Sequence, residues 1–309
     1  MSAQARKENE ALDLTGKTAV VAGGSQGIGA GVAVRFAQAG ANVILVGRSR
    51  DRLEKTISDA RRAARSADQK LEYISADLSL VSGVRAAAEE IKSKSDGSVD
   101  FLVQTQGGTP NGIFELTAEG IESHFAVQVL SRFLLNYLLA SSGVLKSSSV
   151  NIMAPGGSQT EFNLVDLELA SFKESNRYVQ LGKHIGRDGV ITDAYTKALQ
   201  SRFPQISFFH ISPGLVQTDV MTNQNVPFPL KQIATYILFP IASRTFGYTV
   251  QSYADLPVFL AANPAAEKII KSEGFFLTDK NKKVSVSPYA LDKKNQTAVF
   301  EKLLSYLPK

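Results

Sequence analysis

The 309-residue sequence contains no cysteine and no tryptophan, and it has only three histidines. Without cysteine the chain can form no disulfide bond, no thiolate nucleophile and no cysteine-ligated metal centre. The histidines, His124, His184 and His210, lie far apart along the chain and lack the close spacing of metal-binding motifs. We therefore expect no metal site.

A strong excess of charge is missing as well. The chain carries 34 basic and 29 acidic residues, which gives a formal net charge of +5. No aromatic residue interleaves with the basic cluster of Arg61, Arg62 and Arg65. This cluster is therefore typical of a solvated helix face, and we expect no nucleic-acid partner.

The sequence also lacks a long uninterrupted apolar run. Its most apolar stretch, residues 226–242, is broken by three prolines and by Lys231. We expect no stable membrane insertion, and we interpret about residues 220–245 as a lid over an apolar substrate pocket. Residues 1–13 are polar and charged and have no apolar signal-peptide core. They predict a flexible N-terminal segment, a cytoplasmic location, and one domain over residues 14–309.

Short apolar runs alternate with helix-like patterns over most of the chain. The alternation predicts a single-domain α/β fold of the Rossmann type, with a doubly wound parallel sheet and helices on both faces. Ligands of such sheets bind beyond the carboxyl ends of the strands, where the strand order reverses. Strands are expected at 17–22, 42–46, 71–75, 99–104, 148–153, 206–211 and about 274–277, and helices at about 27–39, 51–66, 80–94, 115–140, 189–202 and 294–306.

Two features stand out within this pattern. Gly40 should close the first of these helices. Residues 158–188 form an unusually long excursion between a strand and the helix after it, and loops of this length are commonly functional.

A glycine-rich turn follows the first expected strand. It reads Ala22-Gly23-Gly24-Ser25-Gln26-Gly27-Ile28-Gly29 and leads directly into a helix. Glycine permits a tight turn and a close approach to a phosphate, because it has no Cβ. The start of the helix offers unpaired N–H groups and a positive dipole end. With a strand before it and an apolar helix after it, the motif predicts dinucleotide binding.

From about residue 14 to residue 262 the chain resembles the short-chain dehydrogenases/reductases. The glycine motif is followed in order by Val46-Gly47-Arg48-Ser49, by Asp77-Leu78 and by Ser212-Pro213-Gly214-Leu215-Val216-Gln217-Thr218-Asp219, each after an expected strand. The resemblance implies a nicotinamide cofactor and hydride-transfer chemistry.

The end of the second strand bears on the choice of cofactor. An NAD site usually has an acidic residue there, whereas this chain has Gly47 followed by Arg48. A guanidinium can pair with the 2′-phosphate of NADP, which a carboxylate would repel. We expect NADP(H), with helix capping as the alternative role of Arg48. By resemblance, Asp77 would bind the adenine amino group, and Val216 and Thr218 the carboxamide and phosphates.

The resemblance gives a full set of expected cofactor-binding residues. These are Gly23, Ser25, Gln26, Gly27, Ile28, Gly29, Arg48, Ser49, Asp77, Leu78, Gln106, Gly107, Lys197, Pro213, Gly214, Val216 and Thr218.

The catalytic positions depart from the family pattern. Family members use a tyrosine for proton transfer, a lysine four residues later, a serine near the substrate oxygen and an asparagine that anchors a water relay. Lys197 matches the lysine, but Asp193 stands at the tyrosine position, Ala154 at the serine position and Gln128 at the asparagine position. The usual Asn-Asn-Ala-Gly after the fourth strand is replaced by the sequence Gln-Thr-Gln-Gly at 104–107.

The chain thus resembles a divergent, fungal-type member that lacks the usual Ser/Tyr pair, and its candidate catalytic residues are Asp193, Lys197 and Gln128. Asp193 is either a general acid or base beside the lysine or a cap, with Thr192, near a helix start. Tyr195 lies about 200° around the helix from Asp193 and should point away. Two residues of the long excursion, Tyr178 and His184, would have to fold back over the nicotinamide.

Three functions remain open. The first is an NADP(H)-dependent oxidoreductase that acts on a hydrophobic small-molecule carbonyl or alcohol, in secondary metabolism. The second is a non-redox enzyme, an isomerase, dehydratase or cyclase, that uses Asp193 as acid or base. The third is a catalytically silent dinucleotide-binding protein. Homo-oligomerisation is left open as well.

Overall fold

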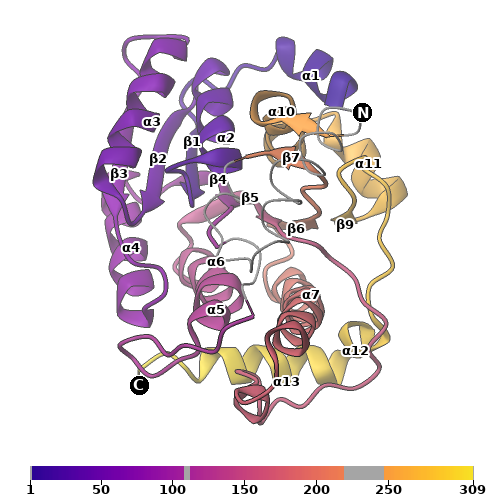
Figure 1. Cartoon of the computed structure of the whole chain (residues 1–309). Coiled ribbons are helices and arrows are strands. Elements are labelled where there is room, and N and C mark those ends of the chain that lie inside the picture. The colour runs from indigo at the N-terminus through magenta and orange to yellow at the C-terminus, as the bar shows by residue number, and fades with distance from the viewer. Residues whose placement is uncertain (1, 108–111, 219–246, 309) are drawn as a thin grey trace.

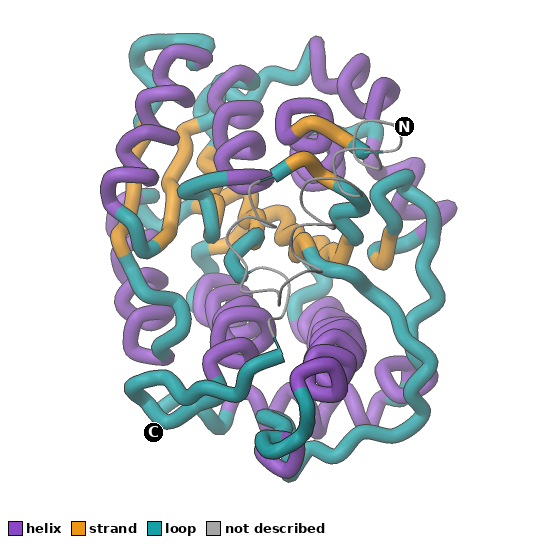
Figure 2. The backbone as a smooth tube through the Cα atoms, in the orientation of Figure 1, coloured by secondary structure: helices purple, strands orange, loops and turns teal. Residues whose placement is uncertain are grey.

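The computed structural model describes residues 2–107, 112–218 and 247–308. Seven strands form a central parallel sheet in the spatial order β3-β2-β1-β4-β5-β6-β9 (Figures 1 and 2). The strands are β1 (Thr18–Ala22), β2 (Asn42–Gly47), β3 (Leu71–Ser75), β4 (Val99–Gln104), β5 (Leu145–Ile152), β6 (Ser207–Ile211) and β9 (Phe276–Leu277). A separate parallel pair joins β7 (Val216–Gln217) to β8 (Tyr248–Thr249). The predicted doubly wound fold is confirmed.

Helices cover both faces of the sheet (Figure 1). One face carries α2 (Gly27–Gln38), α3 (Arg50–Ala63) and α10 (Val250–Ala262), and the other carries α4 (Val81–Lys94), α6 (Ser131–Ser141) and α7 (Arg177–Arg202). Outside these layers lie α1 (Ser2–Glu10) and α13 (Lys293–Leu304). The shorter elements are α5 (Ser123–Phe125), a π-helical turn η1 (Ala126–Leu130), a 3₁₀ turn η2 (Ala170–Phe172), α11 (Ala266–Glu273) and α12 (Pro288–Leu291).

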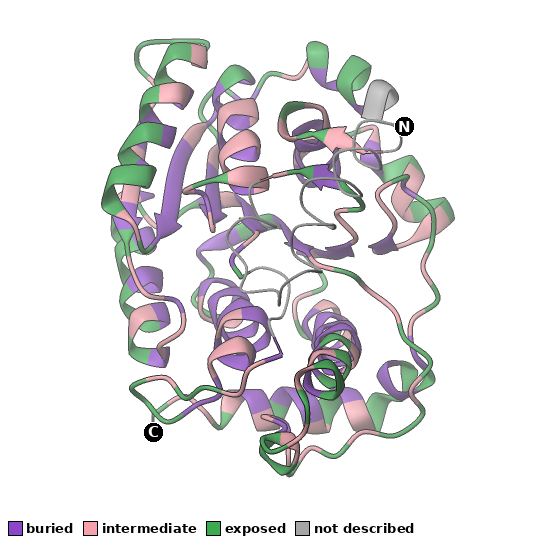
Figure 3. Cartoon of the chain, in the orientation of Figure 1, coloured by how far each residue is buried: buried purple, intermediate pink, exposed green. Residues whose placement is uncertain are grey.

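The strands read as continuous apolar runs because both of their faces are buried (Figure 3). Along β1, Val20 and Ala22 pack into the core under α4 and α6, whereas Val21 packs into the core under α2 and α10. Phe36 of α2 stacks on Phe101 of β4, with ring centroids 5.8 Å apart. These two cores fix the sheet between its helices.

A row of residues crosses the sheet near the carboxyl ends of its strands. The strand register pairs Ala22 with Gln104, Gln104 with Asn151, Asn151 with His210, and His210 with Phe276. Residues paired in this way share one face of a sheet, here the face under α6 and α7. Three polar side chains therefore lie in a buried row beside the reversal of strand order between β1 and β4, where ligands of such folds bind.

Two expected helices have different limits in the structure. The helix expected at 115–140 begins only at Ser123, because a turn at Thr117 and Gly120 precedes it and the Glu122 carboxylate caps its first N–H groups. The helix expected at 189–202 begins at Arg177, where the Asn176 side chain accepts two backbone N–H bonds. The last 12 residues of the predicted excursion at 158–188 therefore belong to α7. Glycines at 182 and 186, which are poor helix formers, conceal this extension in the sequence.

Helix α1 lies within residues 1–13, the N-terminal segment that we expected to be flexible. Residues 2–10 form α1, which packs against α10. The side-chain amide of Asn9 donates to the carbonyl of Asp255 at 2.8 Å, and Arg35 donates to the carbonyl of Asn9 at 2.6 Å. The described part of this segment is thus anchored. The expected lid at 220–245 lies outside the described residues.

Candidate active site

The glycine-rich turn joins β1 to α2 at the switch in strand order. Gly23 and Gly27 adopt φ angles of +79° and +55°, in the left-handed region that favours glycine. The amide of Gly23 donates to the carbonyl of Val46 at 2.8 Å, which ties the turn to the end of β2. The side chain of Gln26, the N-cap residue of α2, makes no capping hydrogen bond. The first N–H groups of α2 are therefore available to a ligand or to water as far as this residue is concerned.

Close packing against β4 explains the other glycines of the turn. A Cβ on Gly29 would lie 2.3 Å from the carbonyl oxygen of Gly23, and one on Gly23 would lie 2.4 Å from the amide nitrogen of Gln106. The hydroxyl of Thr105 donates to the carbonyls of Ala22 and Gly23, at 2.9 and 3.1 Å. Sequence reasoning missed Thr105, which fastens the turn to the end of β4.

The predicted phosphate-selecting residues follow β2 and face the same turn. Arg48 is exposed, and Ser49 is the N-cap of α3 without a side-chain capping bond. Arg52, one turn into α3, donates to the Gln26 side chain at 2.6 Å. A Cβ on Gly47 would lie 3.5 Å from Ser25. The Arg52 guanidinium thus contacts the turn, and Arg48 is exposed at the end of β2. The capping interpretation of Arg48 has no support, because α3 begins at Arg50 and its N-cap residue is Ser49.

The remaining predicted cofactor residues lie at neighbouring strand ends. Asp77 follows β3, and its carboxylate accepts from the amide and the hydroxyl of Ser79 at 2.9 and 2.7 Å, while Leu78 is buried. A Cβ on Gly27 would lie 3.5 Å from Thr218, so the segment after β6 reaches the glycine turn. Pro213 and Gly214 begin this segment, and Val216 is held in β7.

A buried polar network replaces the family's Asn-Asn-Ala-Gly segment. The Gln104 side chain donates to Asn151 at 3.0 Å, and the Gln106 side chain donates to Gln104 at 3.0 Å and to Ser131 at 3.2 Å. Arg132, only 2% exposed, donates to the carbonyls of Gln104 and Gln106, at 2.8 and 2.6 Å. Burial lowers the pKa of Arg132 to about 10. Nothing in the sequence pattern pointed to this arginine, which lies in the largely apolar helix α6.

Gln128, the predicted stand-in for the family's asparagine, lies within the π-helical turn η1. Its side chain is buried, accepts from Arg132 at 3.3 Å and packs on Gly107, where a Cβ would approach within 2.5 Å of it. π-Helical turns are frequent at functional sites. The structure thus brings Gln106, Gly107 and Gln128 together beside the glycine turn.

Asp193 lies in the middle of α7 and is fully buried. One carboxylate oxygen is 2.7 Å from Nδ1 of His210, and the other accepts from the amide of Gly156 at 2.8 Å. The capping interpretation is therefore wrong, because the helix starts sixteen residues earlier, at Arg177. His210 was not among the predicted residues, although a histidine inside an otherwise apolar strand was a visible signal.

Lys197 lies one turn after Asp193 and is partly buried. Its ammonium group lies 5.1 Å from the centroid of the Phe276 ring. Burial lowers the pKa of Lys197, the carboxylate of Asp193 opposes this shift, and Lys283 adds to it. The side chain therefore combines a positive charge with access to the carboxyl ends of the strands.

The other candidate proton donors lie elsewhere. Tyr195 is fully buried and packs edge-on against Phe133, which confirms that it points away from the cleft. Burial raises its pKa far above the ordinary value. His184 is 1% exposed and is therefore not a free side chain over the site, whereas Tyr178 is 62% exposed at the start of α7.

His184 belongs instead to a buried ionic cluster between α5 and α7. Its ring stacks on His124 at 5.1 Å, and His124 contacts Asp188 at 2.7 Å. Arg187, fully buried, pairs with Asp188 at 2.7 Å and with Glu122 at 3.2 Å. Burial, Arg187 and His124 lower the pKa of His184 to about 4. Burial pushes the pKa of Asp188 up, but Arg187 and His124 outweigh it and lower that pKa to about 2.

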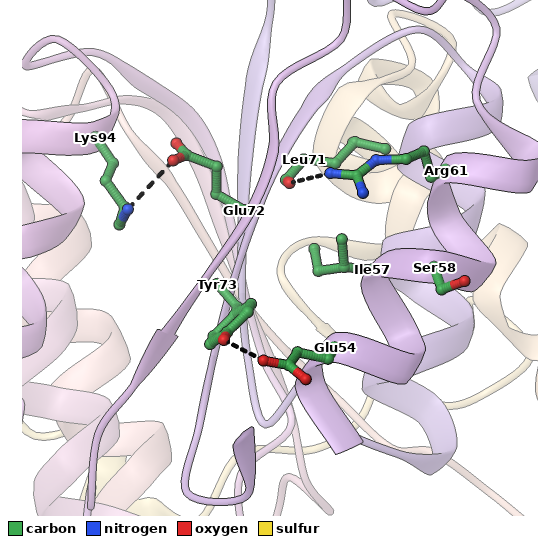
Figure 4. A pocket seen from close by; sticks show the side chains of 8 residues that line it. All are labelled: Glu54, Ile57, Ser58, Arg61, Leu71, Glu72, Tyr73 and Lys94. Atoms are coloured by element: carbon green, nitrogen blue, oxygen red, sulfur yellow. Dashed lines mark hydrogen bonds and ion pairs between the residues drawn. The ribbon is translucent and has the colours of Figure 1, made fainter. Parts of the chain in front are cut away.

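A surface hollow at the free edge of the sheet is unrelated to these residues (Figure 4). It lies between α3, β3 and the end of α4, and Tyr73 donates to Glu54 there at 2.6 Å, while Lys94 pairs with Glu72 at 3.2 Å. None of the residues predicted for the site lines it.

The described residues also bear on metal binding and on membrane insertion. Within residues 2–107, 112–218 and 247–308, no group of three or more acidic or histidine side chains is arranged to hold a metal ion. Over the same residues, no helix has both the length and the apolar character needed to cross a bilayer.

Known proteins share both the sequence pattern and the fold. A profile of the short chain dehydrogenase family matches residues 17–162. An oxidoreductase of Emericella nidulans is 30% identical over 228 residues, which are 72% of this chain and 65% of that protein. The chain thus spans slightly less than two thirds of that relative. Retinol dehydrogenase 14 of Homo sapiens is 27% identical over 276 residues, covering 82% of this chain and 76% of that protein.

A solved short-chain dehydrogenase/reductase from Serratia marcescens has the same fold, with a TM-score of 0.58. It is 22% identical, and the alignment covers 89% of this chain and 98% of that one. Members of this superfamily bind a nicotinamide dinucleotide. The family profile, the relatives and the fold agree, and the chain belongs to the short-chain dehydrogenase/reductase superfamily.

Proposed function

We propose that the protein is an NADP(H)-dependent oxidoreductase that acts on a hydrophobic carbonyl compound or alcohol. The observation that carries the proposal is the backbone of the glycine turn. Gly23 and Gly27 hold left-handed conformations at the start of α2, and the N-cap residue Gln26 makes no side-chain capping bond to its first N–H groups. Such a helix start attracts a pyrophosphate through its N–H groups and its dipole.

The residues around this turn fit a dinucleotide. A Cβ added to Gly27 would meet only Thr218 among the described residues, at an ordinary contact distance of 3.5 Å, so a phosphate could approach the bare backbone closely. Gly27 and Thr218 would hold the phosphates, and Asp77 would lie at the adenine end. When bound, the nicotinamide supplies or accepts the hydride. Lys197 would hold its ribose.

The preference for NADP(H) follows from charge at the end of β2. Arg48 is exposed there, and Arg52 is oriented toward the glycine turn by its bond to Gln26. Gly47 supplies no carboxylate to accept from a ribose 2′-hydroxyl. Two guanidinium groups would stabilise a 2′-phosphate through charge-assisted hydrogen bonds, whereas NAD offers them no charge at that position.

Lys197 is the group that we assign to the reaction. Its ammonium can donate a hydrogen bond to the substrate oxygen or hold a water molecule that delivers the proton. Asp193 is a poor direct donor, because it is fully buried and protein donors engage both of its oxygens. The second function considered, a non-redox reaction with Asp193 as acid or base, therefore has no structural observation in its favour.

The hydrophobic substrate class rests on likeness and on sequence. Retinol dehydrogenase 14, which is similar to this protein over most of the chain, is named after retinol, an apolar alcohol. The apolar residues 226–242 provide the second argument. Secondary metabolism, a cytoplasmic location and homo-oligomerisation stay predictions.

The test is consumption of NADPH in the presence of hydrophobic aldehydes and ketones, followed by the absorbance of the reduced nicotinamide. We expect the absorbance to fall in proportion to the alcohol formed. Conversion of a substrate at constant absorbance would favour the non-redox function. Tight NADPH binding without any conversion of the panel would favour the silent dinucleotide-binding protein.

A further inference from the structure

A buried acid–imidazole pair lies one helical turn away from Lys197. Asp193 of α7 and His210 of β6 are both fully buried, and their side chains meet at 2.7 Å. The pair stands where family members have their tyrosine, because Asp193 occupies that position in the sequence. Neither residue reaches the surface, so the pair must act through a neighbour.

The hydrogen bonds of the pair follow from the chemistry of a carboxylate beside an imidazole. A carboxylate only accepts hydrogen bonds, so in the tautomer that pairs with it Nδ1 of His210 carries the shared proton. Nε2 of the same ring is buried and has no hydrogen-bond partner among the described residues. The amide of Gly156 donates to the second oxygen of Asp193 at 2.8 Å. Both oxygens of the carboxylate are thus engaged by neutral donors of the protein.

Lys197 lies one helical turn away and shares surroundings with the pair. Its ammonium lies 5.1 Å from the centroid of the Phe276 ring, and the ring of His210 meets the same ring edge-on at 6.4 Å. Asp193 raises the pKa of Lys197, against the effects of burial and of Lys283. The charges of Asp193 and Lys197 therefore interact. Among the ion pairs of the described residues, however, none joins Asp193 to Lys197.

We propose that His210 and Gly156 hold the Asp193 carboxylate away from Lys197, so that the pair positions the lysine ammonium for a ligand instead of pairing with it. In this arrangement the negative charge of Asp193 attracts the Lys197 ammonium, while both carboxylate oxygens are already hydrogen-bonded to His210 and Gly156. Asp193 and His210 are thus positioning residues. Only the identity of the ligand, a nicotinamide ribose or a substrate oxygen, rests on the proposed function.

The proposal follows from what a buried carboxylate requires. Without the imidazole, one oxygen of Asp193 would lose its donor in a site that excludes water, which is strongly unfavourable. Lys197, one turn along the same helix, is close enough to replace that donor, because residues four apart face the same side. The new ion pair would withdraw the ammonium from the cleft and raise the pKa of Lys197.

Two variants of His210 separate positioning from bulk packing. His210→Asn keeps an N–H donor near the place of Nδ1, whereas His210→Leu fills similar space without a donor. The readout is acylation of Lys197 by an amine-reactive reagent in the ligand-free protein, measured by mass spectrometry relative to the exposed Lys55 of α3. Acylation needs the neutral amine, whose fraction falls about tenfold for each unit by which the pKa rises.

We expect His210→Leu to slow acylation of Lys197 relative to Lys55 by about tenfold, and His210→Asn to leave it within about twofold of the wild type. The double variant His210→Leu with Asp193→Asn should restore the rate, because the amide keeps an acceptor for Gly156 but carries no charge. A merely structural role predicts no such rescue. An unchanged rate in His210→Leu, or a double variant as slow as the single one, would overturn the proposal.

If His210→Leu does not fold, the acylation rate of Lys197 in the single variant Asp193→Asn tests the proposal. We expect it to speed acylation of Lys197, because the charge that raises its pKa is gone, and an unchanged or slower rate contradicts the proposal. Titration with NADPH separates this result from the proposed function. Acylation that follows the expected pattern in a protein that binds no NADPH would leave the pair's role intact and refute the cofactor assignment.

Discussion

The candidate active site has a nucleotide end, around the glycine turn, and an acid–base end, around Lys197. The two ends differ in how closely their sequences follow the family pattern. At the nucleotide end the glycine turn, the residues after β2 and the segment after β6 keep the family motifs, and the structure brings Gly27 and Thr218 together. At the acid–base end only Lys197 keeps its family identity. The tyrosine position is a buried aspartate, and Gln-Thr-Gln-Gly at residues 104–107 replaces the family's Asn-Asn-Ala-Gly.

This difference reflects what each end demands. The nucleotide end depends on backbone geometry, and a Cβ on Gly23 or Gly29 would lie within 2.4 Å of neighbouring atoms, so few substitutions are tolerated. The acid–base end depends on side chains that can be exchanged if the buried polar groups stay paired. Arg132 provides such pairing by donating to the carbonyls of Gln104 and Gln106. The helices and the sheet can thus persist while the chemistry between them changes.

The largest expected effect tests the nucleotide end. Gly27→Val should abolish NADPH binding at concentrations that saturate the wild type. A left-handed conformation costs a residue with a Cβ roughly 1–2 kcal/mol, and the branched side chain would fill the phosphate's approach. The measurement is an NADPH fluorescence titration. Gly182→Ala, at a helical position of α7 with open space around it, is the matched control and should bind normally. Normal binding by Gly27→Val would remove the turn from the site.

The next effect tests the acid–base end. Lys197→Met should lower turnover by about 10²–10⁴-fold, the usual range for loss of a group that transfers a proton. Tyr195→Phe, two residues away but facing the core against Phe133, should keep the wild-type rate. Steady-state assays of both variants decide the point. Equal rates for Lys197→Met and the wild type would place the acid–base chemistry on another residue.

A smaller effect tests the choice of cofactor. Arg48→Ala should weaken NADPH binding by about 1.5–3 kcal/mol, the range for hydrogen bonds to a charged group, and should hardly change NADH binding. Arg62→Ala, at the far end of α3 and paired with Asp59, serves as the control. Calorimetric titration with both nucleotides measures the difference. Equal losses for NADPH and NADH would refute the role of Arg48.

The last effect concerns the stability of the buried cluster that supports α7. The folded-state pKa of His184, about 4, lies below the unfolded value near 6.5, so the unfolded chain binds more protons between these limits. Stability should therefore fall as the pH drops from about 6.5 to 4, by at most about 1.4 kcal/mol per pH unit from this residue. Urea unfolding of the wild type and of His184→Phe should show a weaker pH dependence in the variant. Parallel profiles would contradict the burial argument.

Local sequence signals predicted most of the fold and the nucleotide end. Most strands of the sheet, such as β1, β2 and β4, are short and largely apolar. The glycine turn combines a backbone requirement with a fixed spacing. The early start of α7 escaped prediction because Gly182 and Gly186 conceal a helix whose stability comes from tertiary contacts such as those of His184 with His124. The π-helical turn that holds Gln128 has no local signature either.

The acid–base end was predicted less well because its pairings join distant parts of the chain. His210 and Asp193 are seventeen residues apart and meet only when β6 packs under α7. Arg132 binds carbonyls at the end of β4, twenty-six and twenty-eight residues before it. Sequence spacing identified Lys197 by its family position, but it could not show which donors would surround Asp193.

The most direct test of the account follows the hydride itself. The enzyme is incubated with NADPH fully deuterated at C4 of the nicotinamide and with a hydrophobic carbonyl compound, and the product is analysed by mass spectrometry. We predict that the alcohol carries one deuterium and that Lys197→Met slows its formation without changing the label. A product free of deuterium, formed while the labelled NADPH stays unchanged, would contradict the assignment of this protein as an NADP(H)-dependent oxidoreductase.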